Sequence, residues 1–317
     1  MRQWIVRFVV LALWAVTMIY VFGAGAIIGK HRAYMAEGPI QMVGKVLTLL
    51  PQNEVMFCEG EELTCGENDV TARRPVPCDP FSAPDPRRAV LFTFGQSNAA
   101  NEGRDRYLAS DDVINFNPFD GKCYIAQDPL LGAYGEAGSV WGRVGDGLIE
   151  AGAFDQVLIV PIAIGGTSIE RWAKGGGLNP RITFALQAMA AKGLRPTHIL
   201  WHQGEADRIK ETTTARYVEQ FGTIVETFHA QGVDAPLYPA VATYCYMFDL
   251  DQIEAYQPAI DAVRTAQQRL PDHYPGVRPG PDTDRITGAA YRPDNCHFTH
   301  LGLQAHADLW VKALTAK

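Results

Sequence analysis

Four short apolar runs, each followed by glycines or polar residues, constrain the fold of this chain more than any other feature. They are rich in Val, Ile, Leu and Phe and cover residues 88–94, 156–164, 197–201 and 237–244. Stretches with the Ala, Glu, Gln and Leu content of helices accompany them, around residues 140–151, 182–192, 211–231 and 252–269. Near-continuous apolar strands that alternate with helices predict a mainly parallel sheet covered on both faces, a three-layer α/β/α sandwich with right-handed crossovers.

Polar residues and glycines follow three of these predicted strands at the point where each strand ends. The first strand leads into Gly95-Gln96-Ser97-Asn98, the second into Gly165-Gly166-Thr167-Ser168 and the third into Gln203-Gly204-Glu205. Ligands of open α/β sheets bind outside the carboxyl ends of the strands. We therefore expect these three segments to converge on one site.

Ser97, Asp294 and His297 are the residue types of a serine-nucleophile triad. A serine is a weak nucleophile unless a neighbouring base takes its proton and a third group orients that base. Ser97 follows a strand-terminal glycine, which permits a tight turn that presents the hydroxyl at the sheet edge. Asp294 precedes His297 by three residues, so its carboxylate can reach Nδ1 and leave Nε2 free to face Ser97.

Acyl transfer at Ser97 also needs donors for the negative charge that develops on the carbonyl oxygen. Three groups at the strand ends are candidates for this oxyanion hole: the backbone N–H of Ser97, a glycine N–H from Gly165 or Gly166, and the side-chain amide of Gln203. Together with the triad they predict ester chemistry without a metal or an organic cofactor.

The motifs resemble those of the SGNH-hydrolase superfamily, and within it the sialate O-acetylesterase-like carbohydrate esterases, whose nucleophile block reads Gly-Gln-Ser-Asn. The resemblance covers residues 88–317 and keeps the order of the blocks: Gly95-Gln96-Ser97-Asn98, Gly165-Gly166-Thr167-Ser168-Ile169 with Trp172, Trp201-His202-Gln203-Gly204-Glu205-Ala206-Asp207, and Asp294-Asn295-Cys296-His297-Phe298. It implies a flavodoxin-like esterase domain with Ser97 as nucleophile, His297 as base and Asp294 as its partner. It also implies an oxyanion hole formed by Ser97, Gly165 or Gly166, and Gln203.

Four further residues of these blocks are candidates for supporting or substrate-binding roles: Gln96, Asn98, Trp172 and Glu205. We expect Glu205 to brace the Ser97 loop while Asp294 remains the acid of the triad. Trp172 is interpreted either as a sugar platform or as ordinary core packing. The segment from Asn101 to Ser139 is expected to form the rim of the substrate site, because loops on a rigid scaffold carry specificity.

The N-terminus carries a long apolar run, from Phe8 to Gly29, that holds no charged residue. As a helix its 22 residues would span roughly 33 Å, enough for a bilayer core. It is either a retained anchor or a signal peptide cut after Ala24-Gly25-Ala26, and its continuation through Ile27 and Ile28 favours the anchor. We predict an anchor or uncleaved signal over residues 1–32, a membrane-proximal Cys/Pro-rich linker over 33–87, and the esterase domain over 88–317.

Six cysteines form an even set that is consistent with three disulfides in an oxidising compartment: Cys58, Cys65, Cys78, Cys123, Cys245 and Cys296. Their 15 possible pairings stay open. The first three lie in a polar, turn-rich segment where a local cross-link would replace a missing core. No paired Cys-x-x-Cys spacing of a zinc site occurs, so no metal is expected. Export and disulfides together predict a membrane-anchored protein with an extracytoplasmic (periplasmic or extracellular) catalytic domain.

The charge distribution argues against nucleic acid as a partner. Four of the 28 Lys and Arg residues lie in the first 32 residues, so the rest of the chain holds 24 basic against 35 acidic residues. Binding to a phosphate backbone needs clustered cations, and no such cluster occurs. The expected partners are an acetylated carbohydrate substrate and, through the N-terminal helix, a membrane.

The leading hypothesis is therefore a serine esterase that removes O-acetyl groups from a carbohydrate through an acetyl-enzyme intermediate. An acyl esterase or O-acyltransferase with the same triad remains open. So does an inactive carbohydrate-binding protein on an esterase fold, because fold alone does not imply function.

Overall fold

The computed structural model describes residues 63–246 and 253–316. The predicted anchor over residues 1–32 and residues 33–62 of the predicted linker lie outside these ranges. Within the described ranges, no helix is both long and apolar enough to cross a bilayer.

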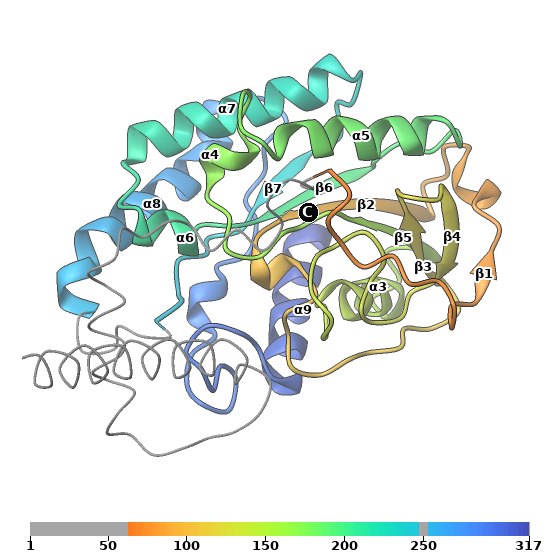
Figure 1. The fold of residues 1–317 in the computed structure, drawn as a ribbon, viewed down its shortest axis with the longest axis horizontal. Coiled ribbons are helices and arrows are strands. Elements are labelled where there is room, and N and C mark those ends of the chain that lie inside the picture. The colour runs from red at the N-terminus through yellow and green to blue at the C-terminus, as the bar shows by residue number, and fades with distance from the viewer. Residues whose placement is uncertain (1–62, 247–252, 317) are drawn as a thin grey trace, which may run out of the picture. The chain divides into compact units, whose positions relative to one another are not determined.

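A seven-stranded sheet forms the centre of the part of the chain that the structure describes (Figure 1). Its strands are β1 (Pro75–Val76), β2 (Arg88–Gly95), β3 (Val113–Asn117), β4 (Lys122–Ile125), β5 (Gln156–Pro161), β6 (His198–His202) and β7 (Leu237–Pro239). They lie in the order β1-β4-β3-β5-β2-β6-β7. The pairs β3-β5, β5-β2, β2-β6 and β6-β7 are parallel. Among the described strands, only β4 forms antiparallel pairs, with its neighbours β1 and β3. The expected mainly parallel sheet is confirmed.

Helices cover both faces of this sheet (Figure 1). The helices α4 (Ile169–Trp172), α5 (Asn179–Ala190), α7 (Thr214–Ala230) and α8 (Ile253–His273) lie on one face, and α3 (Trp141–Glu150) and α9 (His300–Thr315) lie on the other. A short helix, α6 (Glu205–Ile209), follows β6 directly.

Alternate residues of β2 supply the two cores. Val90, Phe92 and Phe94 pack with α5, α7 and α8 in one core, while Ala89 and Leu91 pack with α3 and α9 in the other. Successive side chains of a strand point to opposite faces, so a strand buried on both sides must be apolar throughout. This is why the run over residues 88–94 reads as near-continuously apolar.

Three strands lie where the sequence predicts a linker or a loop: β1, β3 and β4. The segment 101–139 contributes β3 and β4, so part of the expected substrate rim belongs to the sheet, next to its edge strand β1. The sequence of β3 does not form an apolar run, because it contains the polar residues Asn115 and Asn117, which are nevertheless buried. The amide of Asn115 exchanges hydrogen bonds with the backbone of Leu131, at 2.7 and 3.0 Å, which satisfies a polar side chain inside the core.

The predicted linker packs on the sheet from Leu63 onward. Its strand β1 pairs with β4, and Phe81 is 5% exposed in the core. A disulfide joins Cys78 to Cys123 of β4, so the expectation of a purely local cross-link among the first three cysteines is wrong for Cys78. A second disulfide joins Cys245 to Cys296, and Cys65 is also disulfide-bonded.

Candidate active site

The nucleophile turn, residues 95–99 with the predicted nucleophile Ser97, begins where Gly95 of β2 pairs with His202 of β6. Gly95 has φ 132°, a conformation that residues with a side chain rarely adopt, and a Cβ at this position would lie 2.0 Å from the carbonyl oxygen of His202. The next residue, Gln96, donates its backbone N–H to the same carbonyl oxygen at 3.0 Å. Glycine is therefore required for the close approach, and the chain then enters a 3₁₀ turn, η3 (Ser97–Ala99), at the sheet edge.

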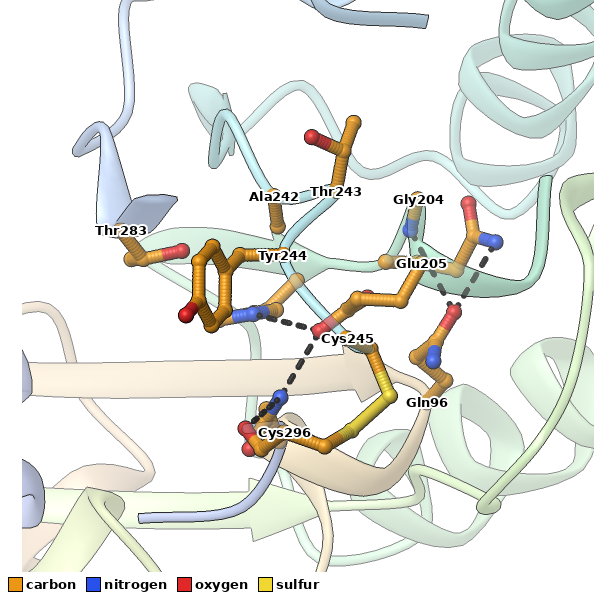
Figure 2. A network of polar contacts seen from close by, with 12 residues as sticks. Gln96, Gly204, Glu205, Ala242, Thr243, Tyr244, Cys245, Thr283 and Cys296 are labelled. Carbon is orange, nitrogen blue, oxygen red and sulfur yellow. Dashed lines mark hydrogen bonds and ion pairs between the residues drawn. A yellow bond between two sulfur atoms is a disulfide. The ribbon is translucent and has the colours of Figure 1, made fainter. Parts of the chain in front are cut away.

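Gln96 ties this turn to the start of α6. Its side chain is 3% exposed, and Oε1 accepts the backbone N–H groups of Ala206 at 3.1 Å and Gly204 at 3.4 Å. Figure 2 shows this oxygen facing the Gly204 turn. Gln96 is thus a scaffold residue beneath the nucleophile turn.

Gly165 lies beside Ser97. A Cβ built on Gly165 would be 3.7 Å from Cβ of Ser97 and 3.1 Å from Oε1 of Glu102. Ser97 itself is 7% exposed, and Gly166 has φ 69°. The bare glycine backbone leaves room next to the serine, where an oxyanion hole would have to form.

The base loop, residues 286–299 with the predicted base His297, carries an aspartate and a histidine in direct contact. Asp294 Oδ2 lies 2.9 Å from His297 Nδ1, and Asp294 Oδ1 accepts the backbone N–H groups of His297 at 2.7 Å and Cys296 at 2.9 Å. Burial raises the pKa of Asp294, but the interactions with His297 and the two backbone donors outweigh it and lower the pKa to about 2. The carboxylate thus occupies Nδ1, and Nε2 lies 3.8 Å from Sγ of Cys296.

Asn98 connects the nucleophile turn with the base loop, although the two are far apart in sequence. Its Nδ2 donates to the carbonyl oxygen of Cys296 at 3.3 Å and to Oε1 of Glu205 at 2.8 Å. The backbone N–H of Arg104 also donates to the carbonyl oxygen of Phe298 at 2.9 Å. The residues next to Ser97 and His297 are therefore hydrogen-bonded to each other, which brings both segments into one site.

Glu205 lies behind Asn98, as expected for a bracing carboxylate. It is 1% exposed, and its Oε1 is 3.4 Å from Nε2 of His202. Burial raises the pKa of Glu205, but the hydrogen bonds and charge of His202 together with Asn98 more than offset it, so the pKa lies below its ordinary value. A buried carboxylate that stays ionised holds Asn98 firmly.

Gln203 lies in the scaffold, which differs from the arrangement that the resemblance implies. Its side chain is fully buried, and Nε2 contacts three buried acceptors: the carbonyl oxygen of Thr167 at 3.1 Å, Oε1 of Gln96 at 3.3 Å and the carboxylate of Asp207. Tyr217 donates its hydroxyl to Oε1 of the same amide at 3.1 Å. Because an amide nitrogen carries two hydrogens, these acceptors leave none directed at a substrate.

Trp172 is also a core residue. It is fully buried, its ring centroid is 5.6 Å from that of Phe94 and 6.0 Å from that of Trp201, and its Nε1 donates to Oγ1 of Thr167 at 2.9 Å. It offers no face to a sugar, so of the two interpretations the packing role is the one that the structure supports.

Two more residues hold the site: Arg292, which was not among the candidates from the sequence, and Asp207, which belongs to the motif block after the third predicted strand. Arg292 is 1% exposed, and its Nη1 donates to the carbonyl oxygens of Cys296 at 2.7 Å and Tyr244 at 3.0 Å. Burial lowers the pKa of Arg292 to about 10. Asp207 accepts the N–H of Ile169 at 2.8 Å and thereby connects α6 with α4. The sequence signal for Arg292 was its position alone, two residues before Asp294.

Two solved structures with TM-scores above 0.5 share this fold, and a third structure is also similar. A protein from Arabidopsis thaliana has 20% identity and a TM-score of 0.54, with 73% of this chain and 96% of that chain covered. A protein described as a GDSL-like lipase from Parabacteroides merdae has 15% identity and a TM-score of 0.51, with 71% and 94% covered. An acetylxylan esterase from Geobacillus stearothermophilus has 13% identity and a TM-score of 0.46, with 73% and 95% covered. No curated protein matches the sequence of this chain.

A comparison of the sequence with family models identifies the family to which the chain belongs. Residues 88–314 match the model described as carbohydrate esterase, sialic acid-specific acetylesterase. The match includes every candidate site residue and most of the chain, and it confirms the resemblance seen in the motifs. The chain therefore belongs to this family of carbohydrate esterases.

Proposed function

We propose that the protein is a serine esterase that removes O-acetyl groups from a carbohydrate through an acetyl-enzyme intermediate. The observation that carries the proposal is the Asp294–His297 pair, which Asn98 connects to the turn of Ser97. Membership of the carbohydrate esterase family supports the reaction class and the kind of substrate.

Each triad residue has a defined part in the proposed first half-reaction. The Ser97 hydroxyl oxygen attacks the acetyl carbonyl carbon while His297 Nε2 takes its proton. Asp294 holds the Nδ1–H and stabilises the imidazolium that forms. Collapse of the tetrahedral intermediate breaks the ester bond, the sugar oxygen receives the proton from His297, and the acetyl group remains on Ser97.

Water completes the cycle in the second half-reaction. It attacks the acetyl carbonyl carbon while His297 takes a proton from it. Acetate then leaves as His297 returns a proton to the Ser97 oxygen. In both tetrahedral intermediates the oxyanion accepts the backbone N–H of Ser97 and of Gly165 or Gly166. Gln203 supports this arrangement from behind, through its contacts to Gln96 and Thr167.

The surroundings of Ser97 favour a small acyl group. The serine is 7% exposed, and Glu102 and Tyr134 both lie near Gly165. We expect an acetyl ester to be cleaved at least about tenfold faster than the matching octanoyl ester, since a crowded, partly polar site gives a long chain no apolar surface to bury. Comparable rates on both esters would favour an acyl esterase of broader specificity.

We further propose that the catalytic domain is exported and held at a membrane by residues 1–32. The uncharged run from Phe8 to Gly29 supports the anchor, and the disulfides support an oxidising compartment. Alkaline extraction of membranes that contain the full chain tests the anchor. A chain that stays with the membrane supports it, whereas quantitative release identifies a cleaved signal.

The decisive experiment compares aryl acetate hydrolysis by the wild type, Ser97→Ala and the control Ser110→Ala, which changes an exposed serine. We expect Ser97→Ala to lose at least about 10³-fold in kcat and Ser110→Ala to match the wild type. Mass spectrometry of the acid-quenched wild type should find one added acetyl group on the peptide with Ser97. If folded wild type and Ser97→Ala are equally active, the Ser97 mechanism is wrong. If both are folded and equally inactive, the carbohydrate-binding interpretation replaces it.

A sugar acceptor separates hydrolysis from transfer. With an acetyl donor and a carbohydrate acceptor present together, the esterase should release acetate faster than it acetylates the acceptor. Acceptor acetylation that outruns hydrolysis would identify an O-acyltransferase.

A further inference from the structure

The base loop lies on irregular chain and contains a backbone conformation that needs support. Between η5 (Thr283–Arg285) and α9, the described chain forms no helix or strand. Asn295, which follows Asp294 directly, has φ 57°. This left-handed conformation costs a residue with a side chain free energy, although asparagine tolerates it better than most, and it persists where surrounding contacts hold it. The turn that sets Asp294 against His297 therefore depends on what holds it in place.

A disulfide supplies one of these contacts. Cys296, the residue after Asn295, is bonded to Cys245 in the segment that follows β7 (Figure 2). Two further contacts join the same segments: Tyr246 donates its N–H to the carbonyl oxygen of Asn295 at 2.9 Å, and Arg292 bridges the carbonyl oxygens of Tyr244 and Cys296. The disulfide is the covalent member of this set.

The partner segment is itself anchored to the body of the domain. Asp284 accepts the backbone N–H groups of Thr243 at 2.7 Å and Tyr244 at 2.8 Å, and it pairs with Arg264 of α8. Arg264 also pairs with Asp282 at 2.9 Å. Cys245 is thus a fixed point from which the disulfide can hold the loop.

Cys296 lies at the centre of the catalytic contacts. Its N–H donates to Asp294 Oδ1 at 2.9 Å, its Sγ is 3.8 Å from His297 Nε2, and its carbonyl oxygen accepts from Asn98 beside the nucleophile. A displacement of Cys296 therefore changes the position of the acid, the base and the connection to Ser97 together. We propose that the Cys245–Cys296 disulfide positions the Asp294–His297 pair for reaction with Ser97, an inference that rests on the proposed function.

Reduction should release the loop while the domain stays folded. A dithiol reductant attacks one sulfur as a thiolate, forms a mixed disulfide, and in the second step leaves two cysteine thiols on the protein and a cyclic disulfide of the reductant. The dithiol supplies the two electrons. Because both hydrophobic cores lie on the faces of the sheet, we expect the loop to lose its position before the fold is lost.

The disulfide Cys78–Cys123 is a matched control within the same chain. The two bonds join residues 45 and 51 positions apart, so the chain-entropy model assigns them nearly equal contributions to stability. Each bond has one fully buried cysteine, Cys123 and Cys296, both 1% exposed, and one that is partly exposed. Only the Cys245–Cys296 bond is attached to the base loop.

The experiment compares Cys245→Ala/Cys296→Ala with Cys78→Ala/Cys123→Ala on an aryl acetate, at a temperature well below both Tm values. We expect the first variant to lose about tenfold or more in kcat with KM within about twofold, and the second to keep its kcat within about twofold. The Tm of both variants should fall by similar amounts, because each loses one long-range cross-link. Equal losses of kcat in both variants, or no loss in the first, would overturn the proposal.

A dithiol titration gives a second, reversible measurement. Dithiothreitol should inactivate the wild type and Cys78→Ala/Cys123→Ala, and reoxidation should restore activity. It should not lower the residual activity of Cys245→Ala/Cys296→Ala further, since the responsible bond is already absent. Further inactivation of that variant would assign the effect to another disulfide.

The outcomes separate the two proposals. A folded wild type that does not cleave acetyl esters, or a Ser97→Ala variant that does, contradicts the proposed function. A wild type that depends on Ser97 while Cys245→Ala/Cys296→Ala is fully active contradicts only the positioning role of the disulfide.

Discussion

The nucleophile turn and the base loop reach the same site by different means. The turn at Ser97 lies at the carboxyl end of the interior strand β2, where Gly95 and Gln96 pack directly against β6. The loop with Asp294 and His297 lies on irregular chain and is held by a disulfide, a buried arginine and single hydrogen bonds. The first half of the site cannot move without disturbing the core, whereas the second can be loosened while the core stays intact. Changes near Ser97 should therefore reduce stability, and changes in the base loop should reduce activity first.

The largest effect is expected where the nucleophile turn meets the sheet. Gly95→Ala should lower the free energy of unfolding by about 4 kcal/mol or more, or prevent folding, because its Cβ would lie 2.0 Å from the carbonyl oxygen of His202. Gly152→Ala is the control, since Gly152 also has positive φ, 68°, but a Cβ there meets nothing within 4 Å. Urea unfolding measures both. Equal stabilities of the two variants would show that β2 and β6 can separate freely.

In the base loop, Asp294→Asn should reduce kcat by about 10²–10⁴-fold while the protein remains folded. The amide keeps an oxygen for the backbone donors, but it no longer stabilises a charged imidazole. Steady-state kinetics and circular dichroism test this, with Asp234→Asn as control because that side chain is 88% exposed. An Asp294→Asn variant that is fully active, or one that is inactive because it is unfolded, would break the contrast between the two regions.

Glu205→Gln probes the connection between the regions and should have a smaller, mixed effect. We expect a loss of about 1–3 kcal/mol in stability, because a buried carboxylate that Asn98 and His202 contact is replaced by a neutral amide. We also expect kcat to fall, by less than in Asp294→Asn. Glu219→Gln, at a side chain 68% exposed, should change stability by no more than about 0.5 kcal/mol. Thermal unfolding and kinetics compare the two.

The smallest effect concerns stability at acidic pH. Because the pKa of Asp294 is lowered to about 2, its stabilising contribution is complete above the unfolded-state value of about 3.9 and is lost as the pH falls toward 2. The difference in Tm between wild type and Asp294→Asn at pH 5 should thus shrink as the pH falls below 4. A difference that instead grows as the pH falls would mean that Asp294 is not stabilised as a carboxylate.

Much of the site follows from short-range patterns that the sequence displays. Asp294 and His297 contact each other across three residues, and the strand before Gly95 is apolar on both faces. Roles that depend on distant segments could not be assigned in this way. The amide nitrogen of Gln203 is hydrogen-bonded to Thr167 and Asp207, and Trp172 is enclosed by aromatic rings from two strands.

The sequence by itself determined the alternation of strands and helices, the residues at the strand ends and the local pairing of acid and base, because these depend on periodicity and on contacts within a few residues. Only the tertiary structure decided the pairing of Cys78 with Cys123 and of Cys245 with Cys296, and the place of β3 and β4 in the sheet. It also decided that Asn98 and Arg292 both donate hydrogen bonds to the carbonyl oxygen of Cys296. These contacts join segments that are separated along the chain, and the topology of the sheet alone brings such segments together.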